Sequence, residues 1–139
     1  KEPRSWMWQT DKVQPFIVKE PDKKMGKPVM VFSLSSAAVR DRVDRLYDGQ
    51  DVSIWELTIP EPNNDYLRSK DQLADFRVKV RAILEDINLH APADEAIDVH
   101  MAMSVSCAVT LGMVRNSKAD RAYNLFDHNN DQDLKVMTI

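Results

Sequence analysis

Apolar runs of strand length alternate with segments of helical periodicity along this chain, and that alternation limits the folds open to it. The stretch KPVMVFSLS (27–35) is a continuous apolar run that includes a proline, which is typical of a strand covered on both faces. The next segment, SAAVRDRVDRLYDGQ (36–50), places Val39, Val43 and Leu46 on one helical stripe. A strand followed by a helix of this kind is one unit of an α/β fold.

Two further strand-like and helix-like segments extend the pattern. DVSIWELTI (51–59) is rich in β-branched and aromatic residues, which predicts a second strand. Ser69, with Gln72 three residues later, forms the pattern of a capping box and predicts a helix over 69–88. Apolar residues recur through this helix at helical spacing, and we expect them to form its core face: Leu73, Phe76, Val80, Ile83, Leu84 and Ile87.

A third strand and a third helix are predicted for AIDVHMAM (96–103) and for 105–114. In this strand, apolar residues alternate with Asp98 and His100, so we expect His100 to be half exposed and structural. Further strands are predicted for RAYNLFDHN (121–129), LKVMTI (134–139) and QPFIV (14–18).

Strands separated by helices predict an α/β fold, and a doubly wound, Rossmann-like arrangement suits this length. We therefore expect a mainly parallel sheet with helices on both faces. The 139 residues are expected to form one domain, with an N-terminal extension over 1–27 and a core over 28–139. The chain lacks an initiating Met and stops inside a predicted strand, so we expect a piece of a longer protein.

Charge and cysteine content restrict the partners. The formal net charge of −3, from 19 basic and 22 acidic residues, argues against a surface that grips long DNA or RNA. The same net charge is compatible with a small ligand that carries a few phosphates. Cys107 is the only cysteine, so no internal disulfide is possible, which fits a reducing cytoplasm. No apolar run approaches the ~20 residues of a membrane-spanning helix.

Polar residues follow three of the predicted strands, at the edge of the sheet where ligands of open α/β folds bind. The segments are SLSSA (33–37), PEPNNDYLRS (60–69) and AMSVS (102–106). The two serine-rich turns open helices, whose free N–H groups attract anions, and the longer loop offers groups for bases and a phosphate. The candidate ligand-binding residues are Ser35, Ser36, Asn63, Asn64, Tyr66, Arg68, Ser104 and Ser106.

These residues also have ordinary structural interpretations, because serine is a good N-cap and Asn and Tyr are common in turns. Cys107, one turn into an apolar helix, is expected to be an inert core residue. FDHNND (126–131) resembles a metal-binding loop but lacks the glycine and terminal glutamate of a calcium site, so we expect a solvated turn.

Catalytic motifs are missing from the sequence. It contains no GxGxxG, GxxxxGK[ST], HExxH or GxSxG, and three glycines are too few for a phosphate-wrapping loop. The three histidines, His90, His100 and His128, lie on different predicted elements with no paired nucleophile. We therefore expect binding rather than catalysis, without a metal or cofactor.

Three segments, in order, resemble a known family. They are VMVFSLSSAAVRDRV, LTIPEPNNDYLRSKDQLADFRVKVRAIL and DVHMAMSVSCAVTLGMV, and together with the last strands they are similar to the carboxyl-terminal part of the SAVED domain over 28–139. The best signal is SCAVTLG after a strand, followed by NLFD. Two positions depart from the family pattern: Ser104, where Pro is common, and Met113, where a basic residue often follows the glycine.

The resemblance implies a Rossmann-like fold akin to CARF domains and a sensory role in antiphage defence. SAVED domains bind cyclic di-, tri- or tetranucleotides made by CD-NTase enzymes (CBASS) or type III CRISPR complexes, often oligomerise on binding, and are fused to an effector. The full domain pairs two similar halves, so this chain is expected to be a single sensor domain or half-domain. The alternatives are a phosphodiesterase that cleaves the signal on the same fold, and a pure protein-interaction domain.

Overall fold

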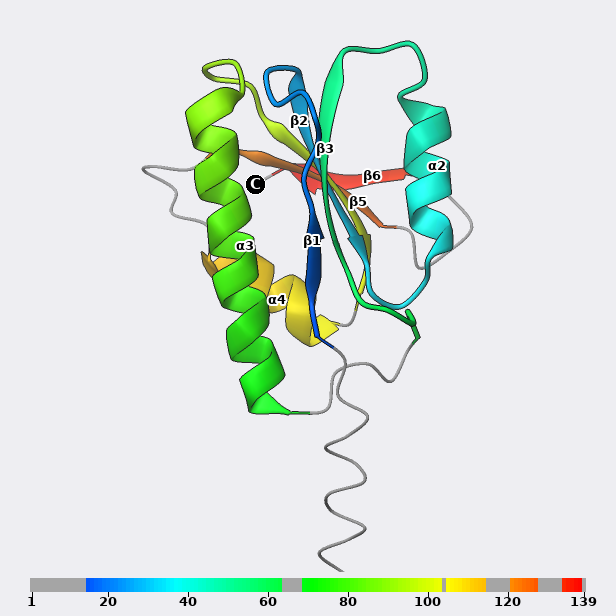
Figure 1. Ribbon diagram of the computed structural model, residues 1–139, viewed down its shortest axis with the longest axis vertical. Coiled ribbons are helices and arrows are strands. Elements are labelled where there is room, and N and C mark those ends of the chain that lie inside the picture. Colours follow the sequence, from blue (N-terminus) through cyan, green and yellow to red (C-terminus); the bar gives the residue numbers. More distant parts are fainter. Residues whose placement is uncertain (1–14, 64–68, 104, 115–120, 128–133, 139) are drawn as a thin grey trace, which may run out of the picture.

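The computed structural model describes residues 15–63, 69–103, 105–114, 121–127 and 134–138. Within them, six strands form one sheet in the order β1-β3-β2-β4-β5-β6, and three helices accompany it (Figure 1). The elements are β1 (Ile17–Lys19), β2 (Lys27–Ser33), α2 (Ala38–Leu46), β3 (Val52–Thr58), α3 (Lys70–His90), β4 (Ile97–Ala102), α4 (Val105–Val114), β5 (Tyr123–Asp127) and β6 (Leu134–Thr138). Every predicted strand and helix is therefore present.

The sheet is mixed, so the expectation of a mainly parallel, Rossmann-like sheet is not confirmed. The inner strands β3, β2, β4 and β5 pair in parallel. The two edge strands run the other way, β1 against β3 and β6 against β5. The physical reason is connection length, because a parallel crossover needs a dozen or more residues. Residues 20–26 and 128–133 are too short to provide one.

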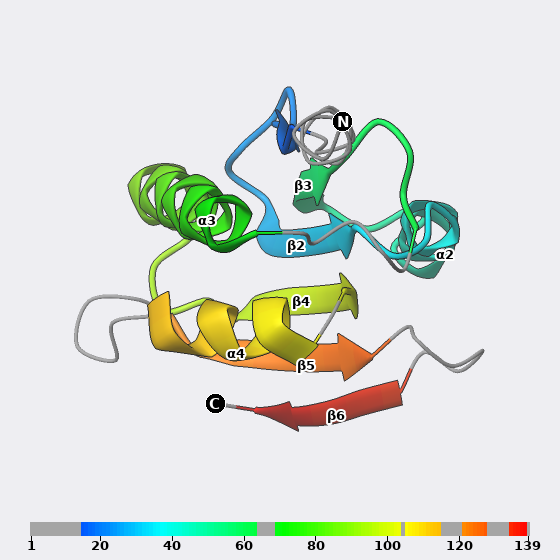
Figure 2. The ribbon, with the colours of Figure 1, turned by 90° about the horizontal axis from the view of Figure 1, so that it is seen from below.

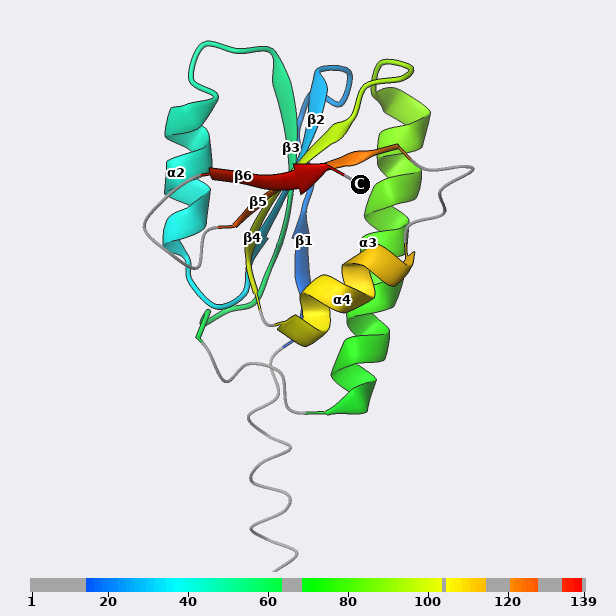
Figure 3. The same cartoon turned by 180° about the vertical axis from the view of Figure 1, so that it is seen from behind.

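Helices cover both faces of the sheet, as expected, but they cover them unequally. Figure 2 shows α2 on one side and α3 with α4 on the other. Figure 3, from behind, shows α4 lying across α3. The α3–α4 side holds the larger apolar cluster, which includes Phe32, Trp55 and Phe76. The α2 side holds a smaller one around Val31, Val39 and Val43.

The long helix α3 follows its sequence pattern closely. The Ser69 hydroxyl accepts a hydrogen bond from the Gln72 amide, and the Gln72 side chain accepts one from the Ser69 amide, so the capping box is formed. The expected core residues of this helix are buried except Leu73, which is partly buried. Cys107 is buried in the same core, as expected.

The shorter helix α2 departs from its predicted stripe in one residue. Val39 and Val43 are buried, but Leu46 is 43% exposed and Tyr47 is buried instead. The helix ends at Leu46, and the chain then turns through Gly49, whose φ of 79° lies in the left-handed region that glycine adopts readily. No helix among the described residues is long and apolar enough to cross a membrane.

Candidate functional site

The carboxyl ends of β2, β3 and β4 meet at one edge of the sheet. The amides of Leu34 and Ser35 both donate to the carbonyl of Ala102, at 3.0 and 2.8 Å. The amide of Asn63 donates to the carbonyl of Leu34 at 3.0 Å. The segment after β2 therefore lies beside the end of β4 and beside the segment after β3.

Three of the eight candidate residues have described side chains. Ser35 is partly buried, while Ser36 and Asn63 are exposed. The Ser36 hydroxyl accepts a hydrogen bond from the Ala38 amide at 3.2 Å, and the Asn63 amide group donates to the Glu61 carbonyl at 2.8 Å. Ser36 is not the N-cap of α2, because Ala37 holds that position and makes no side-chain cap.

The other candidates cannot be placed against these three. Asn64, Tyr66, Arg68 and Ser104 lie outside the described residues. Ser106 lies in the first turn of α4, but its side chain is outside the description. Residues 128–131 of the metal-like stretch also fall outside the described residues. Among the described residues, no group of three His, Cys, Asp or Glu side chains could hold a metal ion.

A buried polar cluster that the sequence analysis missed lies beneath this edge. The Glu56 carboxylate is 5% exposed and accepts from the Ser33 hydroxyl at 2.5 Å and from the Arg40 guanidinium at 3.2 Å. Arg40 also donates to Asp44, one turn further along α2, at 2.9 Å. The Thr58 hydroxyl donates to the Ser33 carbonyl at 3.0 Å. The available signal was Glu56 itself, a charge within a predicted strand.

A second polar network lies at the other end of α2, and it corrects the interpretation of His100. His100 is fully buried rather than half exposed, because α2 covers the polar side of β4. The Tyr47 hydroxyl lies 2.6 Å from the Asp98 carboxylate and 2.7 Å from His100 Nε2. Asn124 and Lys27 bond the same carboxylate, at 3.0 and 3.1 Å.

The pKa values of Asp98 and Tyr47 in this network are shifted in opposite directions. Burial disfavours the charged form of Asp98, but the hydrogen bond from Tyr47, with those from Asn124 and Lys27, lowers the pKa of this carboxyl below its ordinary value. Burial, together with the hydrogen bond to Asp98, raises the pKa of the Tyr47 hydroxyl far above its ordinary value. Through Tyr47, which follows the last residue of α2, this network holds α2 to the sheet.

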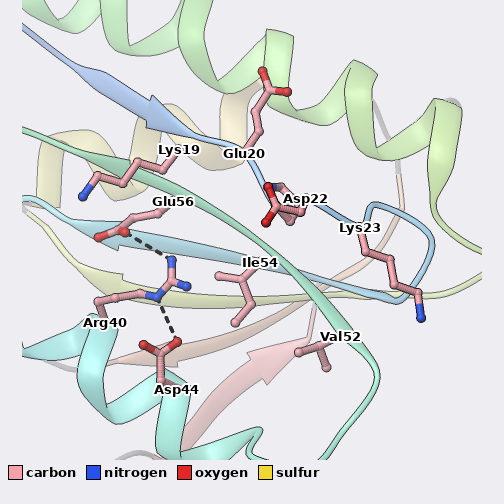
Figure 4. A pocket seen from close by; sticks show the side chains of 10 residues that line it. Lys19, Glu20, Asp22, Lys23, Arg40, Asp44, Val52, Ile54 and Glu56 are labelled. Atoms are coloured by element: carbon pink, nitrogen blue, oxygen red, sulfur yellow. Dashed lines mark hydrogen bonds and ion pairs between the residues drawn. The ribbon is translucent and has the colours of Figure 1, made fainter.

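An open groove of ≈ 630 Å³ lies elsewhere, between α2, β3 and the segment after β1 (Figure 4). Val52 and Ile54 form its partly exposed floor, and Arg40 reaches across it from α2 to Glu56. The remaining lining residues carry charges of both signs, apart from Pro21: Lys19, Glu20, Asp22, Lys23 and Asp44. The groove is therefore distinct from the carboxyl edge. Arg40 and Glu56 line the groove and are also members of the polar cluster around Ser33.

These features define an α/β domain whose described residues place polar side chains at one edge of the sheet. A family model matches residues 1–136, and its description is the SMODS-associated and fused to various effectors sensor domain, SAVED. The chain therefore belongs to the SAVED family of sensor domains, as its resemblance indicated. The comparison with curated proteins gave no match.

Proposed function

We propose that this chain is the ligand-sensing module of an antiphage defence protein. It binds a cyclic di-, tri- or tetranucleotide without cleaving it, oligomerises on binding and activates a fused effector, as part of a CBASS or type III CRISPR system in the cytoplasm. Membership of a sensor family supports the sensing role. The ligand, the oligomer and the defence context are the parts that the proposal adds.

The observation that carries the site is the convergence on the Ala102 carbonyl. Two amides after β2 bond this carbonyl, and the segment after β3 bonds back to the same turn. The start of α2 lies directly beyond that turn, with its N–H groups and positive dipole end. A phosphate at this edge has both hydroxyl and amide donors within the same small region. The proposed ligand-binding residues remain Ser35, Ser36, Asn63, Asn64, Tyr66, Arg68, Ser104 and Ser106.

Two other classes of function compete with this one. A phosphodiesterase needs an acid and a base at the ligand, whereas the histidine and tyrosine that bond each other here, His100 and Tyr47, are buried under α2. A pure interaction domain needs no ligand at all. No observation on the described residues favours either, so both serve as outcomes of the test.

Calorimetric titration of this chain with cyclic di-, tri- and tetra-adenylate and cyclic di-guanylate tests the proposal. We expect one of these to bind, and chromatography of the mixture to show the ligand unchanged. Cleavage of the ligand would favour the phosphodiesterase. No heat of binding with any of them would favour the interaction domain.

A single added charge then locates the site. Ser36→Asp keeps an oxygen that can accept from the Ala38 amide and suits a helix start, but it repels a phosphate, so we expect binding to weaken about tenfold or more. Gln50→Glu adds the same charge at an exposed turn before β3, at the opposite edge, and is the matched control. Equal effects of the two changes would rule out the carboxyl edge as the site.

A further inference from the structure

The turn between β2 and α2 is fixed by side chains at both of its ends. Ser33 is the last residue of β2. Its hydroxyl donates a hydrogen bond to the Glu56 carboxylate, and its carbonyl accepts one from the Thr58 hydroxyl; both partners lie in β3. Arg40, in the first turn of α2, bonds the second oxygen of Glu56. Glu56 therefore joins the end of the strand to the start of the helix across residues 34–37.

This turn carries Ser35 and Ser36. On its other side, the Leu34 and Ser35 amides donate to the Ala102 carbonyl, and the Asn63 amide donates to the Leu34 carbonyl. Glu56 adds to these backbone bonds a side-chain link between the two ends of the turn, from Ser33 to Arg40. The buried Glu56 carboxylate therefore helps to orient the turn that carries the Ser35 hydroxyl and the first N–H groups of α2.

General stability does not account well for such a cluster. Burying a carboxylate such as that of Glu56 carries a desolvation penalty, which a pairing with the half-exposed Arg40 offsets only in part, and apolar side chains of similar size often give equal or greater stability. Hydrogen bonds differ from apolar packing in that they fix direction. A bridge of this type is therefore better suited to holding a binding turn in one geometry than to holding the fold together.

We propose that Glu56 is a positioning residue for the ligand edge: through Ser33 and Arg40 it sets the orientation of the turn that receives the ligand. The inference rests on the proposed function for the identity of the ligand, but not for the order of the turn. Thr58 assists, because it holds the carbonyl of the same Ser33.

Hydrogen exchange of the ligand-free chain and calorimetry with the cyclic oligonucleotide panel test this together. Glu56→Gln removes the negative charge that Arg40 pairs with and leaves one accepting oxygen in place of two. Thr58→Val removes the hydroxyl that donates to the Ser33 carbonyl, at nearly constant shape. Thr58→Val keeps a β-branched residue in the strand, so it preserves the fold even if Glu56→Gln does not. For both, we expect the Leu34 and Ser35 amides to exchange about tenfold faster and binding to weaken about tenfold.

Two controls separate positioning from a loss of stability. Thr58→Ser keeps the hydroxyl and should restore both readouts. Tyr47→Phe breaks the polar network at the far end of α2, and should lower stability while leaving the Leu34 and Ser35 amides and the affinity nearly unchanged. The proposal is overturned if both Glu56→Gln and Thr58→Val leave those amides as slow as in the wild type. It is also overturned if Tyr47→Phe weakens binding as much as Thr58→Val does.

The two proposals fail in different ways. A wild-type chain that binds none of the panel removes the proposed ligand, and the exchange of Leu34 and Ser35 then decides alone whether Glu56 orders the turn. A wild-type chain that binds, with an affinity that neither Glu56→Gln nor Thr58→Val changes, supports the sensor and refutes the positioning role.

Discussion

Replacing Phe76 with Ala tests whether the apolar face of α3 is the main support of the fold. Phe76 is fully buried, and its ring lies 5.8 Å from the rings of both Phe16 and Phe32, measured between centroids. Truncating a buried Phe to Ala costs about 3–5 kcal/mol, of which each aromatic pair contributes about 0.5–1.5. Against a usual total of roughly 5–15 kcal/mol, Phe76→Ala should remove a large share of the free energy of unfolding.

Urea titration followed by tryptophan fluorescence measures this loss. Trp55 is a suitable reporter, because it is 1% exposed and its indole N–H donates to Asp86 of α3 at 2.9 Å. The midpoint should fall while the slope of the transition stays unchanged, which indicates a change in stability alone. Val78→Ala is the matched control on the same helix, since Val78 is 63% exposed, and its effect should stay within about 0.5 kcal/mol. A loss below ~1 kcal/mol for Phe76→Ala would refute the core assignment.

Three further changes test the caps, the buried network and a close backbone contact. Ser69→Ala removes the capping hydroxyl of α3 and should cost about 1 kcal/mol in the same titration. Because the pKa of Asp98 is lowered on folding, its contribution is complete above the unfolded value of about 3.9 and is lost as the pH falls below it. Asp98→Asn should therefore lower stability at neutral pH and flatten the acid limb of stability against pH; an unchanged limb would contradict the assignment. Gly26→Ala would bring a Cβ to 2.9 Å from the Asp51 carbonyl oxygen, and should cost about 1–3 kcal/mol by circular dichroism melting.

The elements of this fold could be predicted from sequence because burial imposes a period on the side chains. The apolar residues of α3 recur at helical spacing and are buried, and Ser69 with Gln72 marks the start of the helix where the structure places it. Leu46 shows the limit of the same reasoning. It continues the stripe of Val39 and Val43, but it lies in the last turn of α2, where the chain leaves the sheet and Tyr47 takes the buried position.

Polar residues inside strands were the weakest part of the prediction. Asp98 and His100 alternate with apolar neighbours, a pattern typical of a strand with one exposed face. That face is covered by α2, and the two side chains are tolerated because Tyr47 bonds both. Glu56 is tolerated in the same way by Ser33 and Arg40. A periodic pattern indicates which face of the strand a residue lies on. It does not reveal the hydrogen-bond partner that allows a polar residue to be buried there, because that partner comes from an element distant in sequence.

The candidate site could be predicted only as far as the backbone determines it. Parallel neighbouring strands bring their carboxyl ends together, so the bonds from Ser35 to Ala102 and from Asn63 to Leu34 follow from strand order. Side chains beyond the strands have no period that indicates their direction. Ser36 illustrates this, since its hydroxyl bonds the Ala38 amide locally although its position suggested a helix cap.

The direction of the edge strands is a different case, because the sequence does hold the information that decides it. Strand-like residues look alike in parallel and antiparallel pairs, so composition alone cannot distinguish them. Connection length can. Residues 128–133 separate β5 from β6, and residues 20–26 separate β1 from β2, and neither stretch can supply the crossover that a parallel return needs. Both edges must therefore reverse direction, which confines the parallel part of the sheet to β3, β2, β4 and β5. Only those strands can direct their carboxyl ends to a common edge, and the three that carry the predicted polar segments are among them.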